Sequence, residues 1–274
     1  MRGSGGGNVA KFRLTAMAAR ERVQALAAES ASTADLVWTD HIQEQMAKRD
    51  INSDAVLGIL RKGDIEGEPE EGSKPGDWKV KLTLKMGTGR VAGVVAAITR
   101  DGRLVLNYSR VGRSPMNTFR HRGKPEKEPY QYTMCGLDDI YLAGGYDRTE
   151  TEYGNGVVIH HMDDLHQAIG AYLATSKKTL DGKEIRFLRH QMDLTQAQLG
   201  DILRVTDQTV ARWEKSEVPI PGPEDLLLRV VYLGHLSKQV DIRALADALR
   251  ASDAAPYDKL LFAPTKRGWE AVAA

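Results

Sequence analysis

The sequence predicts an α+β fold in which N-terminal helices pack on a three-stranded antiparallel sheet and a mainly α domain with a short β segment follows. Two patterns support this prediction. Three runs of β-branched residues between Gly72 and Gly112 are separated by GTG and DG turns. From Leu180 onward, most of the chain has the periodicity of helices. A chain of 274 residues is long enough for two such domains.

The N-terminal part is predicted to hold three helices, over residues 15–29, 39–49 and 53–62. The third begins with a Ser53 cap and ends at Gly63. In the first strand that follows, apolar and mostly cationic residues alternate, so one face of the sheet is apolar and the other basic. The two sets are Trp78, Val80, Leu82 and Leu84, and Lys79, Lys81, Thr83 and Lys85.

Changes in composition along the chain predict the domain boundaries. In order, they delimit a disordered Gly-rich lead or cloning remnant, an α+β domain, a polar Pro-rich linker, an α/β segment, a helical domain and a tail. The ranges are 1–10, 11–113, 114–134, 135–175, 176–253 and 254–274.

Composition excludes several classes of protein. No stretch approaches the roughly 20 apolar residues that a membrane-spanning helix needs. The single Cys135 excludes a disulfide framework, and the first ten residues lack the apolar core of a secretory signal, so we expect a cytoplasmic protein. Residues 1–115 hold 18 basic and 14 acidic residues, net +4, and the remainder holds 20 and 23, net −3. This modest asymmetry is compatible with docking between the two parts.

Residues 182–215, GKEIRFLRHQMDLTQAQLGDILRVTDQTVARWEK, predict three short helices. Thr195 and Gln198 form a capping box at the second helix, and Thr206 caps the third. The short connection between these helices sets them at a steep angle, which lets the third enter a major groove. The predicted core residues of the three helices are Ile185, Leu188 and Met192, then Leu199 and Ile202, then Val210 and Trp213.

The string LTQAQLGDILRVTDQTVARWEK, residues 194–215, resembles the Xre/Cro-type helix-turn-helix pattern LTQxxLAxxLxVsxxTVxRWE. The resemblance implies operator DNA as a partner, and Gln and Arg side chains suit adenine and guanine edges. The predicted DNA-binding residues are Thr195, Gln196, Thr206, Asp207, Gln208, Thr209, Arg212 and Lys215. The alternative is a helical bundle used only for packing or dimerisation.

The preceding string CGLDDIYLAGGYDRTETEYGNGVVIHHMDDLHQAIG, residues 135–170, resembles MqsA-type antitoxins, which repress their own toxin–antitoxin operons. The resemblance implies a homodimer. We expect its seam on the apolar helix after the helix-turn-helix, although these residues could equally be ordinary core: Leu227, Val230, Val231 and Leu233. Such antitoxins often carry a zinc module of paired Cys-x-x-Cys elements, but Cys135 stands alone, so no metal and no cofactor are expected.

The string VWTDHIQEQMAKRDINSDAVLGILRKGDI, residues 37–65, followed by three strands, is similar to small uncharacterised domains of the form WTxHaxeRMxeRdIs. It departs at Gln45, where those domains commonly have Arg. They are related in outline to RelE/MqsR-like toxins, which are metal-independent ribonucleases and need a base, an acid and cations. Candidate catalytic residues are His41, Lys79, Lys81, Arg90, Tyr108 and Arg110. The alternatives are solvated strand lysines, a structural histidine, or a face that binds RNA without cleaving it.

A toxin-like part beside an antitoxin-like part predicts a toxin–antitoxin pair in one chain, joined near Met116 either naturally or artificially. A short tether gives the antidote a high effective concentration, so the toxin-like part stays blocked. The alternative is a transcriptional regulator whose N-terminal domain is an inactive ribonuclease-like module that binds a partner or a signal.

Overall fold

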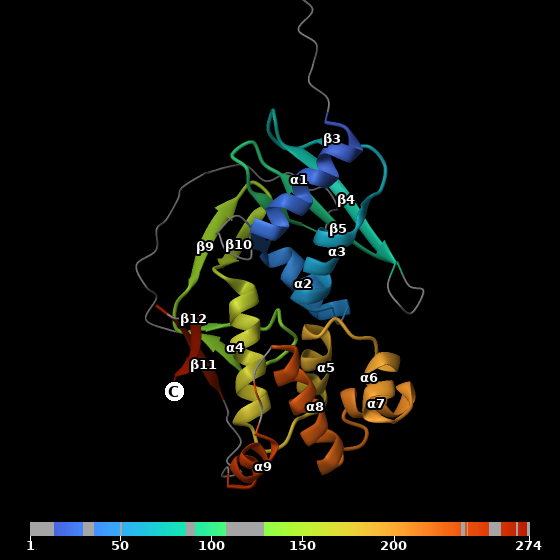
Figure 1. Cartoon of the computed structure of the whole chain (residues 1–274). Helices are drawn as coiled ribbons and strands as arrows, with labels where there is room; N and C mark the ends of the chain where they lie inside the picture. The colour runs from blue at the N-terminus through green and yellow to red at the C-terminus, as the bar shows by residue number, and fades with distance from the viewer. Residues whose placement is uncertain are drawn as a thin grey trace, which may run out of the picture.

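A mixed sheet dominates the N-terminal side of the molecule in the computed structural model (Figure 1). The structure describes residues 14–29, 36–49, 51–85, 91–107, 129–236, 239, 241–251, 259–266 and 268–272. Within these residues, eight strands form the sheet in the order β2-β4-β5-β6-β1-β10-β9, with β3 paired to β4. The strands are β1 (Leu36–Thr39), β2 (Asp64–Ile65), β3 (Glu70–Glu71), β4 (Trp78–Lys85), β5 (Val91–Ile98), β6 (Leu104–Leu106), β9 (Tyr146–Thr151) and β10 (Gly154–Ile159). The predicted α+β class is confirmed.

Three helices cover one face of this sheet: α1 (Ala16–Glu29), α2 (Asp40–Arg49) and α3 (Ser53–Lys62). The alternation predicted for β4 is present, because Val80 and Leu82 are buried in the core that these helices share, while Lys81 is exposed. The cap of α3 differs from the prediction. Asn52 is the N-cap and its side chain accepts a hydrogen bond from the Ala55 amide at 3.0 Å, whereas Ser53 is fully buried.

The sheet is wider than the three predicted strands. Strands β4, β5 and β6 are antiparallel neighbours as expected, but β1 then pairs parallel to β6, with Trp38 opposite Leu106. On its other edge β1 pairs antiparallel to β10, with Trp38 opposite Val157. Strands from both sides of the predicted 114–134 linker therefore share one sheet. The predicted lead 1–10 and most of that linker lie outside the described residues.

A second sheet joins the end of the chain to the middle. Within the described residues it has four strands in the order β12-β11-β8-β7. These are β7 (Tyr130–Gln131), β8 (Ile140–Leu142), β11 (Leu260–Thr265) and β12 (Gly268–Val272). The predicted tail 254–274 thus contains a strand pair, and β11 runs parallel to β8.

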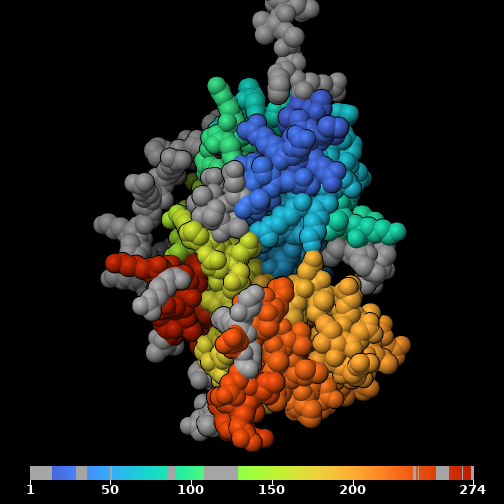
Figure 2. All heavy atoms as spheres, viewed as in Figure 1, coloured from blue at the N-terminus to red at the C-terminus, as the bar shows by residue number. Residues whose placement is uncertain are grey.

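The remaining described elements are six helices: α4 (Met162–Thr175), α5 (Gly182–Gln191), α6 (Gln196–Leu203), α7 (Asp207–Glu214), α8 (Gly222–His235) and α9 (Ile242–Ala251). In Figure 2 the segment around α6 and α7 forms the lower right edge of the molecule. None of the helices that the structure describes is both long and apolar enough to cross a membrane.

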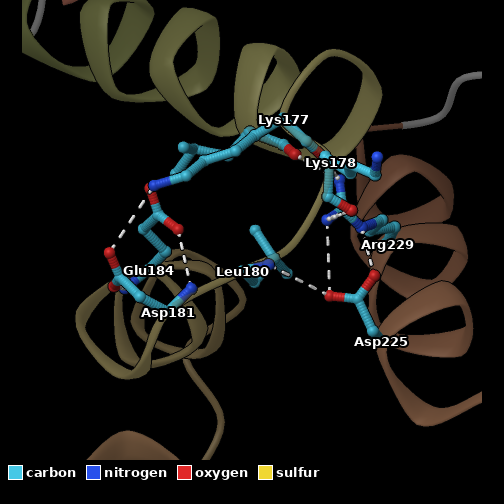
Figure 3. A network of polar contacts seen from close by, with 8 residues as sticks. Lys177, Lys178, Leu180, Asp181, Glu184, Asp225 and Arg229 are labelled. Atoms are coloured by element: carbon cyan, nitrogen blue, oxygen red, sulfur yellow. Dashed lines mark hydrogen bonds and ion pairs between the residues drawn. The ribbon is translucent and has the colours of Figure 1, made fainter. Parts of the chain in front are cut away.

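A buried arginine connects α8 to the end of α4 through hydrogen bonds (Figure 3). Arg229 is fully buried, and its guanidinium pairs with Asp225 at 2.8 Å. The same group donates to the Leu173 carbonyl at 2.6 Å and the Lys177 carbonyl at 2.8 Å. Leu173 lies in the last turn of α4 and Lys177 lies two residues after its end. Arg229 therefore satisfies backbone carbonyls at the end of α4 and holds α8 against it.

Candidate nucleic-acid interface

The predicted helix-turn-helix is formed by α6 and α7, with a tight turn between them. Arg204 ends α6 in the left-handed conformation, with φ 61°. A Cβ on Gly200 would lie 2.7 Å from the Val205 carbonyl oxygen, so the turn can pack this closely on α6 only because residue 200 is glycine. This close approach sets the angle between the two helices.

Both predicted helix caps are present. The Thr195 hydroxyl accepts from the Gln198 amide at 3.2 Å, and the Gln198 side chain accepts from the Thr195 amide at 2.8 Å. At α7, the Thr206 hydroxyl accepts from the Thr209 amide at 3.2 Å. Local sequence therefore fixes where each helix begins.

The predicted core is confirmed at six of its seven positions. Ile202 is wrong, because its side chain is 40% exposed. Leu203 is buried instead, since it lies four residues after the buried Leu199 and so shares its side of the helix. The confirmed positions are Ile185, Leu188, Met192, Leu199, Val210 and Trp213.

A buried ion pair that was not predicted from the sequence joins α5, α6 and α7. Arg189 on α5 contacts Glu214 on α7 through two nitrogens, at 2.5 and 3.0 Å. Arg189 also donates to the Leu194 carbonyl at 2.8 Å, and Gln196 at the start of α6 donates to Glu214 at 2.8 Å. The signal for this pair in the sequence is Glu214, the acid that follows Trp213 in the helix-turn-helix pattern. The contacts hold α7 in one position relative to α5 and α6.

The outer side of α7 is polar and open. Asp207, Gln208, Arg212 and Lys215 are exposed, whereas Thr209 is half-buried. Arg212 and Lys215 lie 3.6 and 3.9 Å from Glu217, and exposed pairs of this kind contribute little stability. These cations can therefore exchange Glu217 for another partner at small cost.

Three more of the predicted DNA-binding residues lie at the two helix starts. Thr195 and Thr206 are exposed caps, and Gln196 is half-buried. The side-chain amide nitrogen of Gln196 donates to Glu214, which holds this side chain at the start of α6. The structure thus brings the predicted group together around α6 and α7.

The predicted dimer seam on α8 is only partly accessible. Leu227 is 40% exposed, and Val230 and Val231 are half-buried. Leu233 is buried in the core of the chain itself, so it cannot meet a second copy in this conformation. For Leu233 the alternative of an ordinary core residue therefore holds.

Of the candidate catalytic residues, the three that the structure describes are not brought together. His41 is exposed on α2, which belongs to the helical layer over one face of the sheet. Lys79 and Lys81 alternate with the buried Val80 and Leu82 and so point to the opposite face. Lys81 pairs with Glu66 at 3.0 Å. Arg90, Tyr108 and Arg110 lie outside the described residues.

No group of three or more His, Cys, Asp or Glu side chains among the described residues has an arrangement that could hold a metal ion. Cys135 is buried, and burial raises the pKa of its thiol, so the thiolate that binds metals is disfavoured.

Residues 38–107 match the model of a domain of unknown function, DUF4258, which covers about a quarter of the chain. The match begins at Trp38 in β1 and ends just after β6, so it contains α2, α3 and the strands β2 to β6. No curated protein and no solved structure matches the chain.

Proposed function

We propose that this protein binds operator DNA through α6 and α7, and that one chain combines a toxin-like part with its antitoxin. The exposed polar side of α7 carries the proposal for DNA. Gln208 and Arg212 lie one helical turn apart on a helix held by the Arg189–Glu214 pair. An α-helix fits the major groove, where Arg and Gln side chains can each make two hydrogen bonds to a base.

We propose that two copies bind DNA together and repress their own operon, as the resembled antitoxins do. A single recognition helix reads only a few bases, and paired half-sites about one helical turn apart need a dimer. Ile202 on α6 and Leu227 on α8 are each 40% exposed, which leaves both apolar side chains available for a seam.

The sharing of one sheet supports the toxin–antitoxin part of the proposal. Strand β10 adds to the edge of β1, which is a common way for one protein to bind another. Elsewhere between the two parts of the chain, the Ser53 amide donates to the Met134 carbonyl at 2.7 Å, and Tyr130 donates to Gln43 at 3.1 Å. An antidote bound by strand pairing and by polar contacts of this kind would dissociate slowly from its toxin.

Selection of bound sequences from a random pool of double-stranded DNA tests the DNA-binding function. The full chain is expected to enrich one motif with two related half-sites. A chain that retains its fold but enriches no motif would contradict the proposal.

The second candidate function is a regulator whose N-terminal part has no ribonuclease activity. The separation of His41 from Lys79 and Lys81 onto different sides of the sheet favours it. Residues 1–115 and 116–274 can be produced together as two chains, with the second then removed by induced proteolysis. A toxin–antitoxin pair predicts growth arrest after removal, whereas an inactive module that stays folded predicts normal growth.

A further inference from the structure

A cleft of about 310 Å³ lies where α3 meets α4, α5 and α8. Its wall combines a helix of the DUF4258-matched region with helices from the C-terminal half of the chain. Polar side chains that line the cleft include Asp54 on α3, His190 on α5 and Tyr232 on α8. The volume falls within the range of sites that bind small molecules.

Two ion pairs cross the rim of the cleft. Arg61 contacts Asp163 at 2.9 Å, and Lys62 contacts Asp193 at 2.5 Å. In each pair a cation of α3 meets an acid from the C-terminal half. The two charges of each pair are therefore opposite and in contact, and Asp54 is the acid of α3 that lines the cleft.

Asp54 is only half satisfied. Its Oδ1 lies 2.8 Å from His166 Nδ1, and the other nitrogen of His166 lies 2.7 Å from the Tyr132 hydroxyl. Its Oδ2 is buried and has no hydrogen-bond partner among the residues that the structure describes. Burial acts to raise the pKa of Asp54, but the interactions with His166, and to a lesser degree with His190 and Gln191, outweigh it and the pKa is lowered, so the group is an anion.

The neighbouring histidine does not neutralise this charge. His190 lines the same cleft, and burial together with Arg189 lowers its pKa to about 4. At neutral pH it is therefore uncharged. His166 contacts the Asp54 carboxylate through Oδ1 at 2.8 Å, so a cation that enters the cleft would share this carboxylate with His166.

Tyr232 adds a second unsatisfied group. Its side chain is fully buried, and in the described part of the chain its hydroxyl has no hydrogen-bond partner. The hydroxyl lies against α4 at Gly170, where a Cβ would be 2.1 Å from it. Burial, and to a lesser degree the charge of Asp54, raises the pKa of Tyr232. Leaving two such polar atoms unpaired inside a protein costs stability unless a ligand satisfies them.

We propose that this cleft binds a small organic cation, an amine or a guanidinium compound, whose N–H groups donate to Asp54 Oδ2 and to the Tyr232 hydroxyl. The unpartnered oxygen of the Asp54 carboxylate favours a charged donor, and the two acceptors select N–H donors. The site is independent of the DNA-binding surface, so its test does not depend on the proposed function.

Isothermal titration calorimetry of the full chain with agmatine and with putrescine tests the proposal, with succinate as an anion of similar size. At least one of the two cations is expected to bind at one saturable site, and succinate is not. Tyr232→Phe is expected to weaken binding at least about tenfold, since it removes one hydrogen bond to a charged ligand. Asp54→Asn should weaken it further. Tyr172→Phe, on α4 where the ring packs against Phe262, is the matched control and should bind normally.

The melting temperature without ligand gives a second readout. Tyr232→Phe removes a hydroxyl that has no partner among the described residues, so this variant should melt at the same temperature as the unmodified chain or higher. A lower melting temperature would mean that the hydroxyl is already satisfied, and would overturn the proposal. Absence of binding by both cations, binding of succinate, or unchanged affinity in Tyr232→Phe would also overturn it.

Discussion

Removal of Arg189 should destabilise the protein more than removal of the whole Arg189–Glu214 pair. The two side chains are only 8% and 4% exposed. Arg189→Met deletes the guanidinium that makes both contacts with the Glu214 carboxylate and leaves Gln196 as its remaining donor. Breaking a buried pair in this way costs about 3–5 kcal/mol, because one charge is left without compensation.

The double variant Arg189→Met/Glu214→Leu removes both charges and fills the space with apolar atoms. Replacement of a buried pair by apolar groups is often neutral. Here it leaves the Leu194 carbonyl and the Gln196 amide without their partners, so we expect a loss of about 1–2 kcal/mol. The double variant should therefore be more stable than the single one.

Urea unfolding followed by far-ultraviolet circular dichroism measures both free energies. Arg243→Met, on the exposed surface of α9, controls for the loss of an arginine and should change stability by less than about 0.5 kcal/mol. A single variant that is as stable as the double variant would refute the reasoning, because Glu214 would then not need its partner.

Three further substitutions test other parts of the structure. Gly200→Ala would place a Cβ 2.7 Å from the Val205 carbonyl oxygen, so urea unfolding should show a loss of about 1–3 kcal/mol, and an unchanged stability would contradict the tight turn. Gly156→Ala would place a Cβ 2.7 Å from the Trp38 carbonyl oxygen, which disturbs the pairing of β1 with β10. Hydrogen exchange should therefore become faster at the β1 amides, and unchanged exchange would contradict the strand pairing. Burial raises the pKa of Glu184 from 4.5 to about 7, so the folded chain binds this proton more tightly than the unfolded chain. The stability that this proton contributes is complete below pH 4.5 and lost as the pH rises through 7, by up to about 3 kcal/mol. Glu184→Gln keeps an oxygen that can accept the hydrogen bond of the helix cap, and the variant should show no such loss of stability between unfolding curves at pH 5 and pH 8. An unchanged pH dependence of stability would contradict the raised pKa of Glu184.

The helix-turn-helix was predictable because its signals are local. Helix caps at Thr195 and Thr206 and the spacing of Leu199, Val210 and Trp213 all lie within a few residues of what they determine. The error at Ile202 arose because a shift of one residue in helical phase separates it from the buried Leu203.

The wider sheet was not predictable by the same reasoning. Strand β1 has four residues, all buried, so it lacks the alternation that marks a half-buried strand. Its pairing with β10 joins distant parts of the chain, and no local pattern encodes such a partner. The contact of Asp54 with His166 is hidden for the same reason, since each residue alone is an ordinary polar residue on a helix.

The most direct test of DNA recognition by α7 is the affinity of Arg212→Ala for the selected motif and for a scrambled sequence of equal length. Loss of a bidentate base contact should weaken binding to the motif by about 1–3 kcal/mol and leave binding to the scrambled sequence less affected. Arg243→Ala removes the same charge from an exposed helix elsewhere and should bind both sequences normally. Equal losses on both sequences, or undiminished binding of Arg212→Ala to the motif, would contradict the account.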